Sequence, residues 1–220
     1  MALITSLRKI RDKITKPLIF DNSGQYWEDR YKRGGNSGAG SYNRLAEFKA
    51  EIINKFVKDK NISTVIEFGC GDGNQLKYFD FPSYTGYDVS EQAVEMCKKI
   101  FEKDETKKFK LLENEINETA GLTLSLDVIY HLVEDEVYTK YMETLFGSSK
   151  KFVIIYSSNY NKEIMLKRRI SHVKHREFTR WVEKNASDFT LIEHIPNRYP
   201  LKENDPTTTF ADFYIFEKQD

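Results

Sequence analysis

The stretch VIEFGCGDGNQ, residues 65–75, constrains the fold more than any other part of this chain. A short apolar, β-branched run, which is typical of a buried strand, ends directly in the alternating glycines Gly69, Gly71 and Gly73. Glycine takes backbone conformations that are closed to other residues and lets a ligand approach the main chain. The pattern therefore predicts a strand followed by a tight turn that holds a ligand.

Strand-like and helix-like segments alternate along the chain from this point. The expected strands are residues 63–69, 84–90, 108–113, 124–132, 151–158, 189–195 and 210–218, and the expected helices are residues 41–60, 72–79, 90–105, 134–146 and a segment near 175–185. This order predicts parallel βαβ units in a doubly wound, Rossmann-like α/β sheet of seven mostly parallel strands. The last two strands are joined without a helical pattern, which predicts an antiparallel hairpin at one edge.

The chain before the first strand is expected to form a helical extension and lid, residues 1–40, on a domain formed by residues 41–220. Glycines in RGGNSGAGS, residues 33–41, mark a flexible loop, and Ser41 is the expected cap of the next helix. Residues 1–16 have the pattern of a basic amphipathic helix, a pattern that also suits an anionic membrane surface. We favour packing of this helix on the protein itself or on a partner subunit, and the oligomeric state stays open.

Charge and cysteine content limit the classes of function. The 220 residues contain 34 basic and 34 acidic side chains, which argues against a DNA-binding protein. Two cysteines cannot cross-link a fold of this size and indicate a reducing compartment. Neither a secretory signal nor a run long enough to cross a membrane is visible, so a cytoplasmic location is expected.

The glycine turn does not fit a phosphate-binding loop. A dinucleotide fingerprint, G-x-G-x-x-G, that starts at Gly69 requires glycine where the chain has Asn74. Asp72 places a carboxylate where phosphates need hydrogen-bond donors, and no Gly-Lys-Ser/Thr follows to make a Walker A loop. The turn therefore suits a cationic or zwitterionic nucleoside.

Residues 65–73 resemble motif I of class I S-adenosylmethionine-dependent methyltransferases, and residues 84–90 resemble motif II. The resemblance implies that S-adenosylmethionine is the cofactor and that Asp88 binds both ribose hydroxyls. It also implies a lid whose arginine pairs with the methionine carboxylate. The implied cofactor-binding residues are Glu67, Gly69, Gly71, Gly73, Asp88, Val89, Tyr26 and Arg30. The alternative is purely structural: glycines that serve a tight turn, and carboxylates that cap a loop or a helix.

An alcohol that accepts a methyl group must lose its proton, so a general base is expected near the end of the fourth strand. His131 resembles the histidine found there in many small-molecule methyltransferases, and the alternative is a histidine that only orients ligands. Asp127, expected in mid-strand, is assigned a structural task. The other residues predicted to contact the acceptor are Tyr130, Tyr42, His172, His175 and Arg176. No metal is expected, because clustered carboxylates are missing.

The acceptor predicted from the sequence is a small polar molecule, methylated on oxygen. The prolines of the signature typical of amine methylation are missing after the fourth strand. Residues 26–75 resemble methyltransferases of bacterial capsule and O-antigen pathways, which implies a sugar or sugar phosphate. The basic segment at residues 165–181 suits an anionic acceptor, and a solvated helix face is the alternative. RNA methylation through residues 167–180 and a non-catalytic cofactor-binding module are the competing functions.

Overall fold

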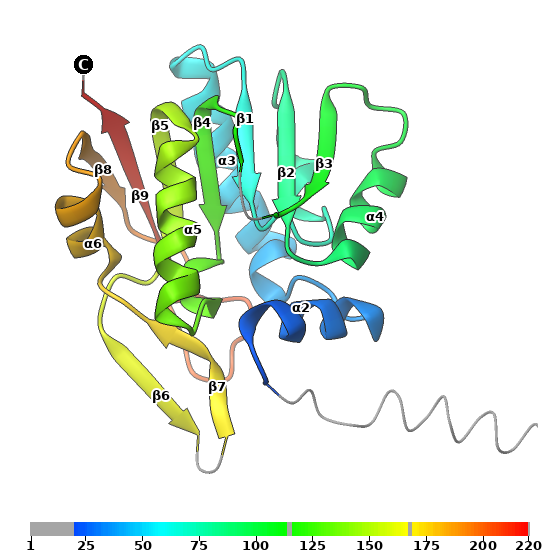
Figure 1. Cartoon of the computed structure of the whole chain (residues 1–220), viewed down its shortest axis with the longest axis vertical. Coiled ribbons are helices and arrows are strands. Elements are labelled where there is room, and N and C mark those ends of the chain that lie inside the picture. Colours follow the sequence, from blue (N-terminus) through cyan, green and yellow to red (C-terminus); the bar gives the residue numbers. More distant parts are fainter. Residues whose placement is uncertain (1–19, 114–115, 167–168, 220) are drawn as a thin grey trace, which may run out of the picture.

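The computed structural model describes residues 20–113, 116–166 and 169–219. Seven strands form one sheet in the order β3-β2-β1-β4-β5-β9-β8 (Figure 1). Their bounds are β1 (Val65–Phe68), β2 (Tyr84–Asp88), β3 (Lys107–Leu111), β4 (Ala120–Leu126), β5 (Ser149–Ser157), β8 (Phe189–Ile195) and β9 (Asp212–Lys218). Strands β1 to β5 pair in parallel, and β9 pairs antiparallel with both β5 and β8. The predicted seven-stranded sheet and its antiparallel edge pair are confirmed.

Side chains of alternate residues enter the two cores on either side of the sheet. In β1, Val65 joins the core beneath α3 (Asn43–Asp59) and α4 (Glu91–Ile100), whereas Ile66 joins the core beneath α5 (Asp135–Gly147) and α6 (Phe178–Asn185). Figure 1 shows α3 behind the sheet and α5 in front of it. Because successive side chains of a strand point to opposite faces, apolar strands such as β1 and β5 require helices on both sides.

Two further elements cover the carboxyl ends of the parallel strands. Helix α2 (Ser23–Lys32) lies across these ends in Figure 1, and the hairpin of β6 (Lys162–Leu166) and β7 (Arg169–His175) lies on the same side of the sheet. The hairpin is a separate two-stranded antiparallel sheet. Ligands of open α/β sheets bind at this end of the strands, and α2 and the hairpin therefore frame the site.

Four local expectations were wrong. Residues 72–79 form a short 3-10 turn, η2 (Gln75–Tyr78), because so few residues join β1 to β2 and Pro82 precedes the second strand. The fourth strand ends at Leu126 and is followed by the 3-10 turn η3 (Ile129–His131). The chain between β5 and α6, for which no strand was expected, forms the β6–β7 hairpin. Helix α3 is capped by Tyr42 without a side-chain hydrogen bond, and Ser41 lies in the preceding 3-10 turn, η1 (Ala39–Ser41).

The basic N-terminal pattern at residues 1–16 lies outside the described residues. Within the described residues, the structure has no helix that is both long and apolar enough to cross a membrane.

Candidate functional site

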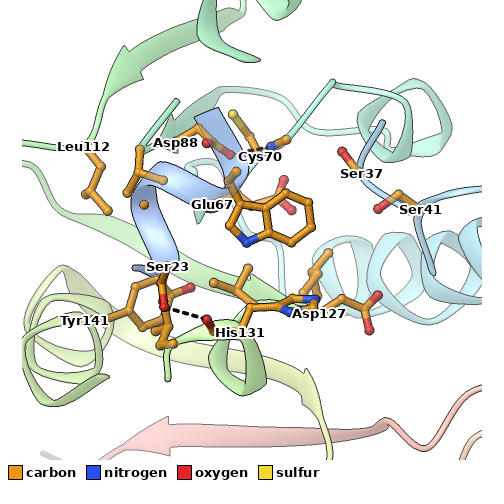
Figure 2. Close-up of a pocket in the computed structure, with 18 of the residues that line it drawn as sticks. Ser23, Ser37, Ser41, Glu67, Cys70, Asp88, Leu112, Asp127, His131 and Tyr141 are labelled. Carbon is orange, nitrogen blue, oxygen red and sulfur yellow. Dashed lines mark hydrogen bonds between the residues drawn. The ribbon is translucent and has the colours of Figure 1, made fainter. Parts of the chain in front are cut away.

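A cavity of about 310 Å³ lies beside the carboxyl ends of β1, β2 and β4, under α2. Strand order reverses at β1, which pairs with β2 on one side and with β4 on the other. Figure 2 shows Asp88 and Leu112 at one end of the cavity, Ser37 and Ser41 at the other, and His131 below. The cavity therefore occupies the position where doubly wound sheets bind ligands, and its volume falls within the usual range for small-molecule sites.

The glycine loop leaves β1 in a conformation that requires glycine. The φ angles of Gly69 and Gly71 are 88° and 59°, in the left-handed region. A Cβ atom on Gly69 would lie 2.5 Å from Val128 Cγ2, and one on Gly71 would lie 2.3 Å from Ser37 Oγ. Gly73 is outside the cavity lining, and a Cβ there would meet Cys97 and Phe101 of the α4 region. Gly69 and Gly71 line the cavity, so the loop forms its floor.

We expect Gly71→Ala to displace the lid loop. The new methyl group would overlap Ser37, and alanine at a positive φ adds backbone strain of about 1–2 kcal/mol. The loss of this packing should weaken S-adenosylhomocysteine binding by at least about 10-fold in calorimetry. Gly147→Ala is the control, since a Cβ atom there meets nothing within 4 Å. Equal affinity of the two variants would contradict the close packing of Ser37 on Gly71.

Asp88, the last residue of β2, connects the glycine loop to helix α4. Its Oδ2 accepts a hydrogen bond from the Gly71 amide at 2.8 Å, and its Oδ1 accepts one from the Ser90 amide at 3.0 Å. The side chain is buried and lines the cavity, and burial raises the pKa of its carboxyl to about 6. Each carboxylate oxygen has lone pairs left for a ligand hydroxyl, so Asp88 can accept from a cis-diol.

Glu67 lies on the floor of the same cavity, in β1. Its Oε2 accepts a hydrogen bond from the Tyr84 hydroxyl at 2.6 Å. Burial raises the pKa of the carboxyl to about 7, against the attraction of the Lys49 ammonium. A cationic ligand beside Glu67 would favour the ionised form and would thereby be bound more tightly.

The raised pKa of Glu67 has a consequence for stability. In the unfolded chain the pKa of this carboxyl has its ordinary value of 4.5, whereas burial raises it to about 7 in the folded protein. Between these values the folded state holds more protons, so the free energy of unfolding falls as pH rises. Glu67→Gln should therefore raise the free energy of unfolding of the ligand-free protein by about 2 kcal/mol at pH 8 and leave it unchanged at pH 4.5. Urea unfolding at both pH values measures this, and equal effects at both would contradict the buried, protonated carboxyl.

The lid is held over the cavity by three sets of side-chain contacts. Asp72 Oδ2 accepts from the Ser37 amide at 2.8 Å and from the Tyr42 hydroxyl at 2.7 Å. Glu28 of α2 accepts from the hydroxyl of Ser90, the N-cap of α4. At the start of α2, the Ser23 amide and hydroxyl both donate to Glu134, just before α5. These contacts fix α2 and the loop that follows it to the rest of the domain beside the cavity.

His131 lines the cavity beneath α2. Its Nδ1 lies 3.0 Å from the carbonyl oxygen of His172 in β7. A carbonyl can only accept, so Nδ1 carries the proton and Nε2 is left with a lone pair. Burial lowers the pKa of the imidazole to about 4, which keeps the ring neutral at physiological pH. The ring packs edge-on against Trp27 at 5.0 Å and stacks on His172 at 5.3 Å. This geometry makes His131 an acceptor of protons.

A buried ion pair, which the sequence did not predict, lines the cavity beside His131. Lys49 of α3 is fully buried, and its Nζ donates to Asp127 Oδ2 at 2.6 Å. Asp127 directly follows β4 with φ at 61°, and its Oδ1 accepts from the Tyr130 hydroxyl at 3.0 Å. The expectation of Asp127 in mid-strand was therefore wrong. The signal for Lys49 was its spacing of four residues from both Leu45 and Ile53, on the apolar face of the helix.

Six of the predicted site residues line the cavity: Glu67, Gly69, Gly71, Asp88, Val89 and His131. The other eight, all in the described part of the chain, lie outside its lining: Gly73, Tyr26, Arg30, Tyr42, Tyr130, His172, His175 and Arg176. Of these, Tyr26 stacks on His172 at 4.6 Å, which ties α2 to the β6–β7 hairpin.

Three of these residues are held by other parts of the protein. The Arg30 Nε donates to the Asn36 carbonyl at 2.6 Å, within the lid. Arg176 donates to the carbonyl oxygens of Leu132 and Val133 and pairs with Asp135, so it fixes the hairpin to the segment that carries His131. His175 is buried and shares a hydrogen bond of 2.7 Å with the Ser158 hydroxyl. Their predicted contacts with ligands stay predictions. Among the residues described, no group of three metal-ligating side chains gathers in one place.

Several methyltransferases are among the solved structures with the same fold. The N-methyltransferase NodS from Bradyrhizobium japonicum, in complex with S-adenosyl-L-homocysteine, has a TM-score of 0.64 at 12% identity, over 91% of this chain and 100% of that one. The magnesium protoporphyrin IX methyltransferase ChlM from Synechocystis, also with S-adenosyl-L-homocysteine, has a TM-score of 0.57 at 10% identity, over 98% and 95%. The methyltransferase domain of bacterial CtHen1 has a TM-score of 0.60 at 19% identity, and the match covers 80% of this chain and 100% of that one. At these identities the likeness shows a common fold.

Sequence comparison gives the family. A search of curated proteins finds no match. A family model described as "Methyltransferase domain" matches residues 41–202, well over half of the 220 residues. The match covers the glycine loop, Asp88 and His131, which also line the cavity. The chain therefore belongs to the methyltransferase domain family and is an S-adenosylmethionine-dependent methyltransferase.

Proposed function

We propose that this enzyme methylates an oxygen atom of a small polar acceptor, with His131 as the general base. The observation that carries the proposal is the hydrogen bond from His131 Nδ1 to the His172 carbonyl. It leaves the Nε2 lone pair in the cavity, on a ring whose lowered pKa keeps it unprotonated. An alcohol loses its proton as it attacks a methyl group, and a neutral imidazole within the cavity can accept that proton.

The residues of the cavity fit S-adenosylmethionine. Gly69 and Gly71 line the cavity with main chain alone, and Asp88 has acceptor capacity for the ribose hydroxyls. Val89 and Leu112 offer apolar surface for the adenine at the same end of the cavity. The cofactor supplies an electrophilic methyl group on a sulfonium, and the protein positions the acceptor and excludes water. Trp27 of α2 contributes to that exclusion, because it lines the cavity and its ring packs edge-on against His131.

For the acceptor we propose an anionic sugar, such as a sugar phosphate of a surface-glycan pathway, nucleotide-activated or free. Support comes from the resemblance of residues 26–75 to capsule and O-antigen methyltransferases and from the basic composition of the β6–β7 hairpin beside the cavity. Lys174 and Arg176 already pair with Asp135. Lys167 and Arg168 lie outside the described residues.

The test is an acceptor panel of nucleotide sugars, sugar phosphates, neutral sugars and short RNAs, with S-adenosylmethionine and the full chain. Formation of S-adenosylhomocysteine and a methyl ester or ether in the product mass spectrum are expected with an anionic sugar. Methyl transfer to nitrogen or carbon would overturn the proposed O-methylation. The absence of turnover with every sugar would overturn the acceptor class.

RNA methylation is the second candidate, because the sequence of the same hairpin is rich in basic residues and the hairpin lies at the end of the sheet that α2 covers. It predicts turnover with short RNA and a binding constant that falls steeply with salt, since phosphate contacts release counterions. A sugar phosphate with one or two charges predicts a much shallower salt dependence. The slope of log affinity against log salt therefore separates the two candidates.

A further inference from the structure

Gln75, in η2, lines the cavity and carries a buried side-chain oxygen without a hydrogen-bond donor among the described residues. The side chain is 5% exposed and lines the cavity. Its Nε2 donates to the Ala46 carbonyl of α3 at 3.0 Å, which fixes the orientation of the amide, because only its NH₂ group can face a carbonyl. Its Oε1 is buried and accepts no hydrogen bond from the described residues. A buried oxygen without a donor is unfavourable, so a donor from a ligand is expected here.

Lys49 brings a buried positive charge to the same side of the cavity. Its ammonium has three N–H donors, one of which goes to Asp127. The ring of Tyr156 lies 5.3 Å from Nζ, and Lys49 lowers the pKa of Glu67, which shows that the two charges are close. Figure 2 places Asp127 at the end of the cavity opposite Asp88. Lys49 is therefore a cation at the end away from the expected ribose site.

We propose that Lys49 and Gln75 bind the amino-acid end of S-adenosylmethionine. Lys49 donates to the α-carboxylate, and Gln75 Oε1 accepts from the α-ammonium together with Glu67. The cofactor then lies across the glycine loop, with its ribose on Asp88. The inference concerns the cofactor and is independent of which acceptor is methylated.

The charges of the cavity complement those of the amino-acid group of the cofactor. The amino-acid group is a zwitterion, and the cavity offers it the Lys49 cation beside the Glu67 carboxyl. Arg30, to which the sequence assigned the carboxylate, donates instead to Asn36 and lies over Trp27. Lys49 is preorganised by its ion pair and lines the cavity, so it replaces Arg30 in this role.

The test compares two ligands in calorimetry. S-adenosylhomocysteine has the amino-acid group, and 5′-methylthioadenosine lacks it. Gln75→Leu should weaken S-adenosylhomocysteine binding by about 10-fold and 5′-methylthioadenosine binding by less than about 2-fold. Lys49→Met should show the same selectivity with a loss of at least about 10-fold. The ratio of the two affinities, rather than either one, measures the contact.

Controls separate this contact from effects on folding. Lys49→Met leaves Asp127 as an unpaired buried carboxylate, so the double variant Lys49→Met, Asp127→Asn is measured beside it. Lys58→Met on α3 and Gln92→Leu on α4 change exposed side chains of the same kinds and should alter neither affinity. Equal losses for both ligands, or no loss, would overturn the proposal. A failure to find any acceptor would bear on the proposed function and leave this test intact.

Discussion

Asp88→Ala is expected to weaken S-adenosylhomocysteine binding by at least about 100-fold, the largest effect of any substitution outside the reacting groups. The side chain is buried in the cavity, and a carboxylate that accepts from two ribose hydroxyls makes two charge-assisted hydrogen bonds. At about 1.5–3 kcal/mol each, their joint loss exceeds a factor of 100. The substitution also removes the acceptor of the Gly71 amide, which loosens the loop under the cofactor. Calorimetry with the full chain measures the loss.

A ligand series distinguishes the ribose contact from the loop contact. In the wild type, removing the 2′- or 3′-hydroxyl from 5′-methylthioadenosine should weaken binding, and in Asp88→Ala the same removal should change nothing. If the deoxy ligands lose equal affinity in both proteins, Asp88 acts on the loop alone. Asp80→Ala, an exposed carboxylate near the end of the same connection, is the matched control.

The sheet and the cofactor were predictable from the sequence because each rests on local chemistry. Gly69 and Gly71 take positive φ angles, and few other residues do so without strain. Strands β1 and β5 contribute side chains to both cores, which appears in the sequence as continuous apolar runs. These signals need no knowledge of distant parts of the chain.

The β6–β7 hairpin was not predictable, because its strands carry charges without an apolar alternation. What holds it is tertiary contact: Arg176 donates to the carbonyls before α5, and His172 accepts from His131. Arg176 was predicted to contact the acceptor from its charge alone. The structure shows it occupied by backbone carbonyls more than 40 positions away in sequence. A basic side chain can bind an anionic ligand only if its hydrogen-bond donors are not already engaged within the protein.

Lys49 is the opposite case, because its position in the amphipathic pattern of α3 gives no indication of a functional role. It lies on the apolar face of α3, where a lysine is rarely buried without a partner. Its partner, Asp127, follows a strand whose end was misplaced by several residues, so the pair could not be recognised from sequence. The end of β4 is decided by the left-handed turn at Asp127, which Lys49 and Tyr130 stabilise together.

The hydrogen bond between His131 and the His172 carbonyl also explains why the hairpin belongs to the site. The Nδ1 proton of His131 is held by a backbone oxygen, which no substitution of His172 removes. The ring of His172 lies between those of Tyr26 and His131 in one stack. Movement of α2 or of the hairpin would disturb this stack, so the orientation of the His131 ring depends on the placement of both.

His131→Ala is expected to lower kcat by about 100- to 10,000-fold and to change S-adenosylhomocysteine affinity by less than about 3-fold, because a general base acts only in the transition state. His131→Phe keeps an aromatic ring against Trp27 and His172 and removes the proton acceptor, so it should lose as much turnover as alanine.

Because the pKa of the His131 imidazole is lowered to about 4, kcat at saturating cofactor should stay level from pH 8 down to pH 5.5. A fall of kcat centred near pH 6.5 would place an ordinary, exposed histidine in the mechanism instead. His194→Ala, on the exposed edge strand β8, is the control for general effects of removing an imidazole. Full turnover in His131→Phe would show that the ring only packs, and the acceptor would then lose its proton to another group of the cavity.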